Sequence, residues 1–426
     1  MKIKALYNKF KLCSGISTDT RKISPNSMFF ALKGDNFDGN TFVTKAFENG
    51  AKYCVVDDEK AVLNAQCLLV SDTLKALQEM AALHRNSIGI PIIALTGSNG
   101  KTTTKELIQG VLSTTYKVKS TIGNLNNHIG VPLTLLNFDK TLDFGIVEMG
   151  ANHQKEIEFL SNIAQPDFGL ITNFGKAHLE GFGGTEGVIK GKSELYDYIK
   201  SNNKTIFINT DDKEQVKQVK GYTKVLTFGS NPNNDFNIEF ISANPYVKVK
   251  FNNTVITSQL IGDYNFGNIA IAIAIGQFFK ISEANIKRAI ESYQPTNNRS
   301  QVLKIGSNRI ILDAYNANPT SMLAALKNFK QLESEHKYLF LGDMFELGEF
   351  ALKEHQAIVN FVQENFQENI FIIGEHFYQT LSPNSIKKFR RFEDLCDYLK
   401  HHKIINASVF IKGSRGMALE RLLQII

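Results

Sequence analysis

The residues with the clearest chemical potential form a glycine-rich turn that runs directly into a lysine and three threonines. Its candidate ligand-binding members are Gly97, Ser98, Asn99, Gly100, Lys101, Thr102 and Thr103. Glycines let a backbone approach an anion closely, and the N–H groups at the start of a helix point toward that anion. Lys101 adds a positive charge for the outer phosphates, and Thr102 offers a hydroxyl to magnesium.

This turn is shorter than the common phosphate-binding loop, because only Ser98 and Asn99 separate its two glycines. The flanking elements support the assignment. The apolar run from Ile92 to Leu95 predicts a buried parallel strand, and the pattern from Thr102 to Ser113 predicts a helix. An ordinary glycine turn before a helix does not account for the Lys-Thr-Thr-Thr run. The sequence therefore predicts a phosphate site.

Polar residues follow other predicted strands. The apolar run Phe144–Val147 ends at Glu148, and an acid there is well placed to hold magnesium, although a solvated strand end is the alternative. Between the strands lies an amide-rich loop with Asn126 and Asn127, which could bind substrate or simply turn. His178 lies beyond another apolar run, at the kind of strand end where open α/β sheets bind ligands.

Three further residues have a simpler interpretation from pattern alone. Lys192 lies in a predicted helix, where it is most simply a surface charge. Asn265 and Asn268 lie at the start of a very apolar helix, Ile269 to Phe279, where helix capping would explain them.

Composition limits the class of protein. A length of 426 residues favours about three domains, and 43% hydrophobic with 21% charged residues is typical of globular proteins. No apolar run reaches the roughly 18 residues of a membrane span, and the N-terminus lacks the apolar core of a signal peptide. The four cysteines are scattered, which suits a reducing, cytoplasmic location. The net charge of +6 is too small and dispersed to indicate nucleic acid as a partner.

The order of the predicted elements suggests boundaries at 1–86, 87–298 and 299–426. The first part alternates short strands and helices and contains a polar turn, Thr18, Asp19, Thr20 and Arg21, that composition alone explains as a loop. The second contains the phosphate loop, with a β-rich stretch from 204 to 260. The turn-prone segment Pro295–Ser300 predicts a linker. Beyond it, strands that end at Asp313, Asp343 and Gly374 predict a second nucleotide-fold-like α/β domain.

Several of these motifs together resemble the Mur ligase family. Thr96–Thr103 resembles its shortened ATP loop, and Glu148–Ala151, Ala177–Glu180 and the pair Asn265 and Asn268 are similar to its further motifs, in the same order. Asp313–Met322 and Gly342–Gly348 resemble the branch that joins D-alanyl-D-alanine (D-Ala-D-Ala) to UDP-N-acetylmuramoyl-tripeptide (UDP-MurNAc-tripeptide).

The resemblance implies an α/β protein of three domains. A central parallel-sheet P-loop ATPase domain is flanked by an N-terminal α/β substrate domain for the UDP-sugar peptide. On the other side is a C-terminal Rossmann-like domain for the dipeptide. It implies a monomeric enzyme of peptidoglycan precursor synthesis that uses ATP and Mg²⁺. ATP phosphorylates a carboxylate, and the dipeptide amine attacks the resulting acyl phosphate.

The resemblance also implies roles for individual residues. Lys101, His178 and Lys192 would be the catalytic residues, with Thr102, Glu148, His178 and a carbamylated Lys192 holding magnesium. Asn265 and Asn268 would contact adenine, Arg299 a phosphate, and Asp313 the ribose. Substrate contacts are expected from Thr18, Asp19, Thr20, Arg21, Asn126, Asn127, Asn316, Asn318, Lys412, Ser414 and Arg415. The sequence departs from the family at Asn40, where a histidine is common.

Two kinds of rival remain. One is another ligase of the superfamily, such as the enzyme that adds the third peptide residue or a folylpolyglutamate synthase; the stretch Tyr315–Met322 argues against both. The other is a nucleotide-dependent switch protein, which would not release ADP in strict dependence on both a carboxylate and an amine. The identity of the third peptide residue stays open.

Overall fold

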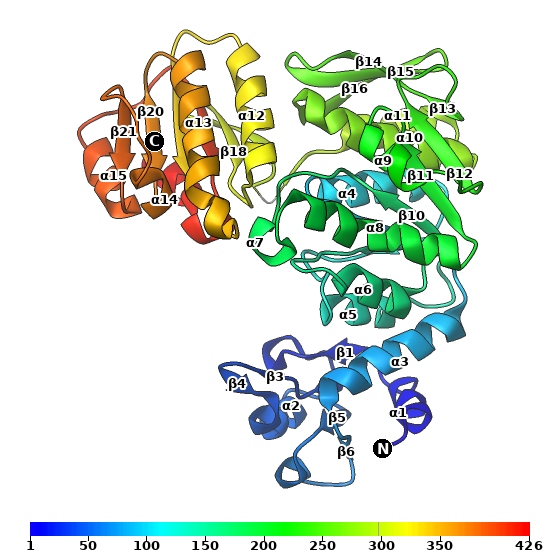
Figure 1. The fold of residues 1–426 in the computed structure, drawn as a ribbon. Coiled ribbons are helices and arrows are strands. Elements are labelled where there is room, and N and C mark those ends of the chain that lie inside the picture. The colour runs from blue at the N-terminus through cyan, green and yellow to red at the C-terminus, as the bar shows by residue number, and fades with distance from the viewer. Residues whose placement is uncertain (297) are drawn as a thin grey trace.

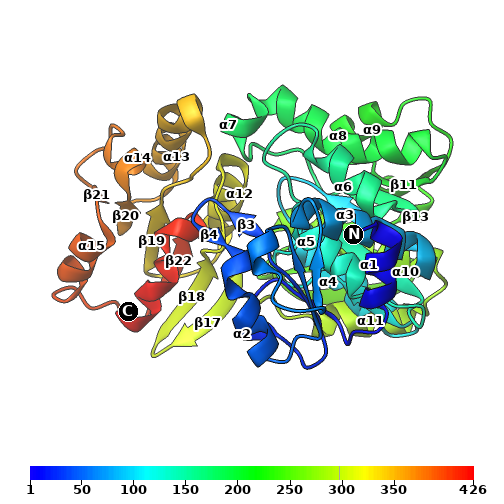
Figure 2. The same ribbon diagram turned by 90° about the horizontal axis from the view of Figure 1, so that it is seen from below.

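The computed structural model describes residues 1–296 and 298–426, so the predicted linker Pro295–Ser300 includes one position, Asn297, outside the described residues. Three separate sheets built mainly of parallel strands follow one another along the chain. Figure 1 shows the N-terminal sheet below the central one and the C-terminal sheet beside it. Viewed from below in Figure 2, the C-terminal part again lies to one side of the other two.

The N-terminal part is a four-stranded parallel sheet of order β1-β2-β5-β6, with a small antiparallel hairpin beside it. The strands are β1 (Ile16–Ser17), β2 (Met28–Phe30), β3 (Lys33–Gly34), β4 (Phe37–Asp38), β5 (Tyr53–Val56) and β6 (Cys67–Leu69). The helices are α1 (Ile3–Phe10), α2 (Val43–Glu48), α3 (Thr73–Ile88) and the short η1 (Thr20–Lys22), η2 (Gly39–Phe42) and η3 (Glu59–Ala61).

Helix α3 joins the N-terminal part to the centre. Its first turn is capped by the Asp72 carboxylate, which accepts the backbone N–H of Lys75, and it ends at Gly89 in the left-handed conformation. Near that end the buried Arg85 guanidinium donates to the carbonyl oxygen of Ala164 and lies 2.8 Å from Asp167. Helix α3 packs on α1 of the N-terminal part and on two helices of the central part, α5 and α6. It therefore belongs to the cores of both parts and crosses the predicted boundary at residue 86.

The central part is a seven-stranded sheet in which every pairing is parallel, in the order β13-β12-β11-β10-β7-β9-β8. The strands are β7 (Ile92–Thr96), β8 (Val118–Ser120), β9 (Phe144–Glu148), β10 (Phe168–Ile171), β11 (Thr205–Asn209), β12 (Val225–Gly229) and β13 (Phe236–Asn237). An antiparallel sheet of β14 (Glu239–Ser242), β15 (Tyr246–Phe251) and β16 (Thr254–Ile261) adjoins it. The parallel strand predicted from Ile92 to Leu95 is confirmed.

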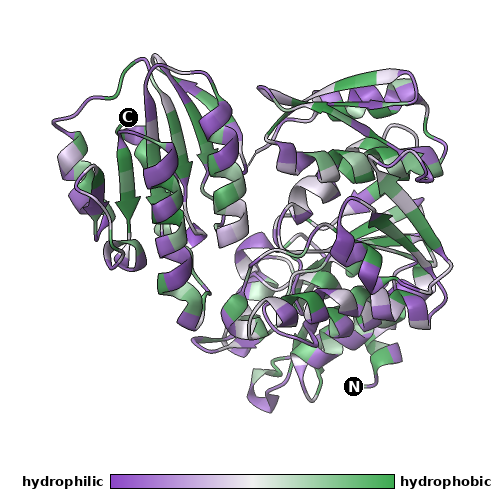
Figure 3. Ribbon diagram, turned by 45° about the horizontal axis from the view of Figure 1, so that its top comes forward, coloured by the Kyte–Doolittle hydropathy of each residue, from purple (hydrophilic) through white to green (hydrophobic). Residues whose placement is uncertain are grey.

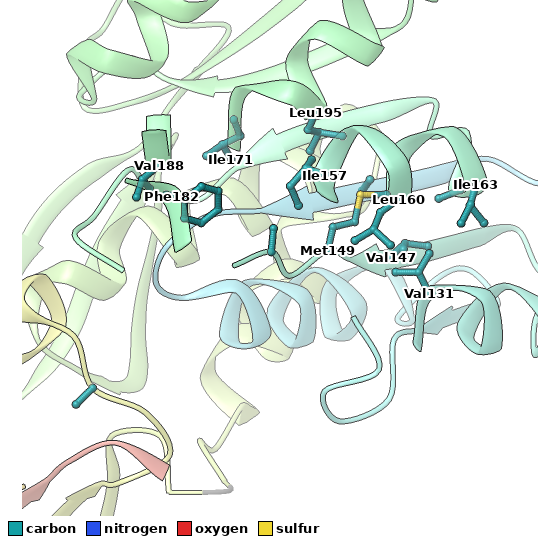
Figure 4. Close-up of a cluster of buried hydrophobic side chains, with 14 of the residues drawn as sticks. Val131, Val147, Met149, Ile157, Leu160, Ile163, Ile171, Phe182, Val188 and Leu195 are labelled. Carbon is teal, nitrogen blue, oxygen red and sulfur yellow. The ribbon is translucent and has the colours of Figure 1, made fainter. Parts of the chain in front are cut away.

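Helices cover both faces of the central sheet. They are α4 (Lys101–Leu112), α5 (Gly130–Leu136), α6 (Glu156–Ala164), α7 (Leu179–Phe182), α8 (Thr185–Ser201), α9 (Lys213–Gln218), η4 (Asp263–Asn265), α10 (Phe266–Phe278) and α11 (Glu283–Ser292). Since successive side chains of a strand point to opposite faces, Ile92 and Ala94 enter one core while Ile93 and Leu95 enter another. In the first core, Val131 of α5 and Leu160 of α6 lie beside Val147 of β9, whereas Leu195 of α8 lies near Ile157 (Figure 4).

The C-terminal part is a six-stranded sheet of order β17-β18-β22-β19-β20-β21, parallel except for its first pair. The strands are β17 (Gln301–Ile305), β18 (Asn308–Asp313), β19 (Lys337–Gly342), β20 (Ile370–Ile373), β21 (Ile386–Phe389) and β22 (Ser408–Lys412). The helices are α12 (Pro319–Gln331), η5 (Gly348–Phe350), α13 (Ala351–Asn365), α14 (Glu375–Tyr378), α15 (Phe392–Leu399), η6 (Arg415–Met417) and η7 (Leu419–Gln424).

Hydropathy follows these layers. In Figure 3 the strands are mostly green and lie inside, whereas the outer faces of the helices are largely purple. Within the described ranges, no helix is both long and apolar enough to cross a bilayer.

Candidate functional site

A cavity of about 1080 Å³ lies where the carboxyl ends of the central strands face the C-terminal part. Parallel strands place their following loops at the same edge of a sheet, which brings distant polar residues together there. The expected site residues that line this cavity are Ser98, Asn99, Gly100, Lys101, Thr102, Thr103, Asn126, Asn127, Glu148, His178, Asn265, Asn268, Arg299, Asp313, Asn316, Asn318 and Lys412.

The phosphate loop needs its two glycines. Gly97 has a φ of 145° and Gly100 a φ of 78°, in the region that favours glycine. A Cβ on Gly97 would lie 2.0 Å from the Thr172 hydroxyl, so no larger residue fits there. Lys101 opens α4 and donates a 2.7 Å hydrogen bond to the Gly97 carbonyl, which holds its ammonium over the loop.

Two cations from distant segments face this cavity. Burial lowers the pKa of Lys101, the Glu148 carboxylate opposes that shift, and the Arg299 guanidinium adds to it. Arg299 in turn stacks over the Tyr315 ring, with its central carbon 3.5 Å from the ring centroid. Lys101 and Arg299 are close enough for their charges to interact, and Lys101 is held by the phosphate loop. Together they favour the binding of a polyanion.

Glu148 is the centre of a buried hydrogen-bond network. Its Oε2 accepts from the Thr102 hydroxyl at 3.0 Å, and its Oε1 accepts from the Asn126 amide at 2.8 Å. Its backbone N–H donates to the Thr121 hydroxyl at 2.9 Å. Thr121 directly follows β8 and was not among the residues predicted from the sequence. This network joins the first turn of α4, the end of β9 and the amide-rich loop.

This network suits Mg²⁺. A carboxylate and a threonine hydroxyl beside a phosphate loop are the protein ligands that this cation commonly takes, with phosphates and waters completing its shell. Across residues 1–296 and 298–426, no group of three or more His, Cys, Asp or Glu side chains could hold a metal.

Lys192 is fully buried, so its interpretation as a surface charge is wrong. Its ammonium donates to the Ala151 carbonyl at 3.0 Å, lies 4.9 Å from the Phe182 ring centroid, and does not line the cavity. Burial, and next the charge of Lys101, hold the pKa of Lys192 well below its usual value. A pattern of helical spacing cannot show this, because α8 is covered by elements distant in the sequence.

His178 lies at the edge between the central and C-terminal parts. It has a left-handed φ of 54°, and its Nδ1 lies against a carboxylate oxygen of Glu346, which follows β19. The hydrogen bond from His178 is the largest influence on Glu346 and lowers the pKa of that carboxyl. The motif Gly342–Gly348 therefore reaches the cavity edge through its glutamate.

The two asparagines at the start of α10 bond to each other: the Asn268 amide donates to Asn265 Oδ1 at 2.8 Å. Asn268 also accepts from the Thr104 hydroxyl at 2.9 Å, which fixes α10 against α4. On the opposite wall, Asp313 accepts from the Ser300 N–H at 3.0 Å and from Lys412 at 2.5 Å. Lys412 is buried, so in this structure it holds Asp313 in place.

Two other C-terminal candidates lie outside the cavity lining. The Ser414 hydroxyl accepts the backbone N–H of Phe345 at 2.9 Å, and Arg415 pairs with Glu420 at 3.1 Å. Asn316 lines the cavity, and its Oδ1 accepts a 2.9 Å hydrogen bond from the backbone N–H of Ala317. The Asn318 side chain forms a hydrogen bond with Asn99, which the sequence pattern does not predict.

The N-terminal candidates also lie away from this cavity. Thr18 and Thr20 flank Asp19, whose carboxylate caps η1 and accepts two side-chain hydrogen bonds from Arg21, at 2.9 and 2.8 Å. These bonds hold the pKa of Asp19 at about 2. The Arg21 side chain is otherwise exposed.

Asn40 has a structural role in this protein. Its buried amide donates 2.9 and 2.8 Å hydrogen bonds to Asp38 and Asp57. Asp57 also receives the ammonium of Lys33 at 2.9 Å. The position at which the sequence departs from the family therefore ties the small β3–β4 hairpin to the N-terminal sheet.

Three family models match the chain in order. The model for the Mur ligase family catalytic domain matches residues 13–85, the Mur ligase middle domain 95–276, and the Mur ligase glutamate ligase domain 298–415. Together they account for most of the sequence.

Individual proteins extend the match. The chain is 34% identical to the UDP-N-acetylmuramoyl-tripeptide–D-alanyl-D-alanine ligase of Bacillus subtilis, over 96% of the chain and 92% of that relative. It is 31% identical to the ligase of the same name from Escherichia coli, over 96% and 92%. A crystal structure of MurF from Acinetobacter baumannii superposes with a TM-score of 0.87 at 29% identity, covering 99% of this chain and 98% of the other.

Proposed function

The chain belongs to the Mur ligase family, and from this premise we propose that it joins D-Ala-D-Ala to UDP-MurNAc-tripeptide with consumption of ATP. The reaction is an amide-bond ligation in peptidoglycan precursor synthesis. The observation that carries the proposal is the convergence of Lys101 and Arg299 beside Glu148 in one cavity, in a chain similar along nearly its whole length to ligases of that name.

The reaction needs a leaving group, because a carboxylate is a poor electrophile. An oxygen of the tripeptide carboxylate attacks the terminal phosphorus of ATP, the bond to ADP breaks, and an acyl phosphate forms. The dipeptide amine then attacks the carbonyl carbon, loses a proton, and phosphate departs. Lys101 and Arg299 would stabilise the charge on the transferring group, as positioned cations do in phosphoryl transfer.

Several contacts of this chain would orient the nucleotide. The hydrogen bond from the Asn268 amide to Asn265 Oδ1 would hold both side chains in place for adenine, and Asp313, held by Lys412, would offer a carboxylate to the ribose. Magnesium held by Thr102 and Glu148 would screen phosphate charge as a Lewis acid. Both ligands already lie within hydrogen-bond distance of each other.

Lys192 is proposed to carry a carbamate. Only a neutral amine adds to carbon dioxide, and burial together with the charge of Lys101 favours the neutral amine. The product is an anion with oxygen ligands suited to a second magnesium.

We assign residues 1–86 to the UDP-sugar peptide, 87–298 to ATP, and 299–426 to the dipeptide. The loop Thr18–Arg21 would then bind the uridine nucleotide, with the amide-rich loop of Asn126 and Asn127 facing the peptide. The enzyme would act in the cytoplasm, where ATP is supplied, and as a monomer.

The deciding experiment measures ADP release with ATP, Mg²⁺ and UDP-MurNAc-tripeptide, with and without D-Ala-D-Ala. Steady ADP release that needs both the tripeptide and the dipeptide is expected. Release that is indifferent to the dipeptide would favour a switch protein. Activity with a single amino acid on a shorter UDP-MurNAc-peptide, and none with the dipeptide, would favour the ligase for the third residue.

A further inference from the structure

The phosphate loop is hydrogen-bonded directly to the C-terminal part. The Asn318 side-chain amide donates to Asn99 Oδ1 at 2.7 Å, across 219 positions of sequence. Asn99 is one of the two residues between the loop glycines, and Asn318 is the residue that caps α12. Asn318 is buried at this junction.

Other hydrogen bonds hold the backbone of Asn99 and the capping turn that contains Asn318. The backbone N–H of Asn99 donates to Asn173 Oδ1 at 3.1 Å, and its carbonyl accepts from the Thr172 hydroxyl at 2.6 Å. On the other side, Asn318 Oδ1 accepts the Ser321 N–H at 2.9 Å, and the Ser321 hydroxyl accepts the Asn318 N–H at 3.1 Å. The Asn318 side chain therefore bonds through its oxygen to helix α12 and through its nitrogen to the phosphate loop.

Further contacts hold the first turn of α12 in place. The backbone N–H of Lys176 donates to the Thr320 hydroxyl at 2.9 Å, and its ammonium pairs with Glu354 of α13 at 2.6 Å. A Cβ on Gly175 would lie 2.8 Å from the Asn99 amide and 3.2 Å from Thr320, so the loop after β10 fits closely between them. The first turn of α12 therefore rests on the loops that surround the phosphate site.

We propose that Asn318 is a positioning residue through which the phosphate loop sets the placement of α12 and the dipeptide-binding part. A nucleotide that orders the loop also orders the Asn99 side chain, which is the acceptor that Asn318 requires. With Asn99 displaced, the buried Asn318 amide loses its partner, and an unpaired buried donor is unfavourable. Nucleotide binding would in this way favour the arrangement in which α12 covers the cavity.

One substitution separates this role from helix capping. Asn318→Asp keeps an oxygen for the Ser321 N–H, and aspartate is as good an N-cap as asparagine. It removes the amide hydrogens and sets a carboxylate oxygen against Asn99 Oδ1. The matched control, Ser321→Ala, removes the two hydrogen bonds between the Ser321 hydroxyl and the Asn318 backbone and leaves the bond between Asn318 and Asn99.

The test is hydrogen–deuterium exchange of the full chain with and without ADP, followed in peptides that cover residues 97–104 and 316–326. In the wild type we expect ADP to slow exchange in both, by at least about fivefold in the second. In Asn318→Asp only the first should be slowed, whereas Ser321→Ala should keep both effects. Full ADP-dependent protection of 316–326 in Asn318→Asp, or its loss in Ser321→Ala alone, would overturn the inference.

Kinetics supply a second measurement, which rests on the proposed dipeptide substrate. Asn318→Asp should raise the KM for D-Ala-D-Ala or lower kcat by about tenfold, with the KM for ATP within about twofold of the wild type. A change confined to the KM for ATP would contradict the proposed coupling. Exchange with ADP alone does not depend on the dipeptide, so a failure of the proposed function is distinguishable from a failure of this inference.

Discussion

The Thr102 hydroxyl donates a 3.0 Å hydrogen bond to Glu148 Oε2, which joins the first turn of α4 to the end of β9. Forty-six positions of sequence separate them, yet each lies at the carboxyl end of a neighbouring strand, because β7 and β9 pair directly. This contact places the two expected magnesium ligands, Thr102 and Glu148, beside the phosphate loop.

Lys101→Ala should abolish ATP turnover, by about a thousandfold or more, while the fold remains intact. The reason is that the Lys101 ammonium is held at the phosphate loop by its hydrogen bond to the Gly97 carbonyl, and such cations contribute strongly to phosphoryl transfer. ADP release measures the effect, with circular dichroism as the check on folding. Lys119→Ala, at a half-exposed lysine on β8, is the matched control and should retain activity. Normal turnover by a folded Lys101→Ala protein would refute the ATPase assignment.

Lys192→Ala should lose most activity, by about a hundredfold, and keep its affinity for ADP, because Lys101 and Thr102 remain. Exchange of the wild type into ¹³C-labelled bicarbonate should give a carbamate signal in the NMR spectrum that the variant lacks. The exposed Lys190, on the same helix, provides the control variant Lys190→Ala. The magnitude follows from the loss of a metal ligand or of its support. A fully active Lys192→Ala enzyme would exclude the carbamate role.

Asp19→Ala and Arg21→Ala should raise the KM for the UDP-sugar substrate by about tenfold and leave the KM for ATP nearly unchanged. Their loop lies in the N-terminal part, away from the phosphate loop, and Asp19 holds Arg21 in one orientation through two side-chain hydrogen bonds. Steady-state kinetics with each substrate varied in turn measures both constants. Lys22→Ala, at the exposed neighbour, serves as control. Equal effects on both substrates would place the nucleotide-sugar site elsewhere.

Acid should destabilise the protein partly through His84. Its Nε2 lies 2.8 Å from the Phe138 carbonyl and its Nδ1 lies 3.1 Å from the Tyr7 hydroxyl, an arrangement that suits a neutral ring donating to the carbonyl. Burial lowers the pKa of His84. Because the unfolded state binds the proton more readily, the stabilisation present at neutral pH is lost as pH falls below about 6.5, by at most about 1.4 kcal/mol per pH unit.

Urea unfolding across this pH range measures that loss. His84→Gln should flatten the dependence below about pH 6.5, whereas His153→Gln, at a largely exposed position, should leave it unchanged. An unaltered slope in His84→Gln would show that other groups account for the acid sensitivity.

Local sequence determined the phosphate loop. The strand from Ile92, the glycines at 97 and 100 and the helix from Lys101 depend on neighbours within a few positions, so their pattern was sufficient. The positions of Glu148 and His178 at the cavity were also predictable, because the carboxyl ends of parallel strands share one edge of a sheet. The helix was expected from Thr102 to Ser113 and is found one residue earlier at each end.

Tertiary structure decided the rest. The burial of Lys192 depends on what covers α8, and the partner of Asn318 depends on how α12 meets a loop 219 residues away. The substrate role expected of Lys412 stays a prediction, whereas the pairing of β18 with β22 in the C-terminal sheet places its ammonium on Asp313. Residue type and spacing predict which backbone forms locally, whereas burial and partner choice follow from packing between elements whose order in space the local pattern does not contain.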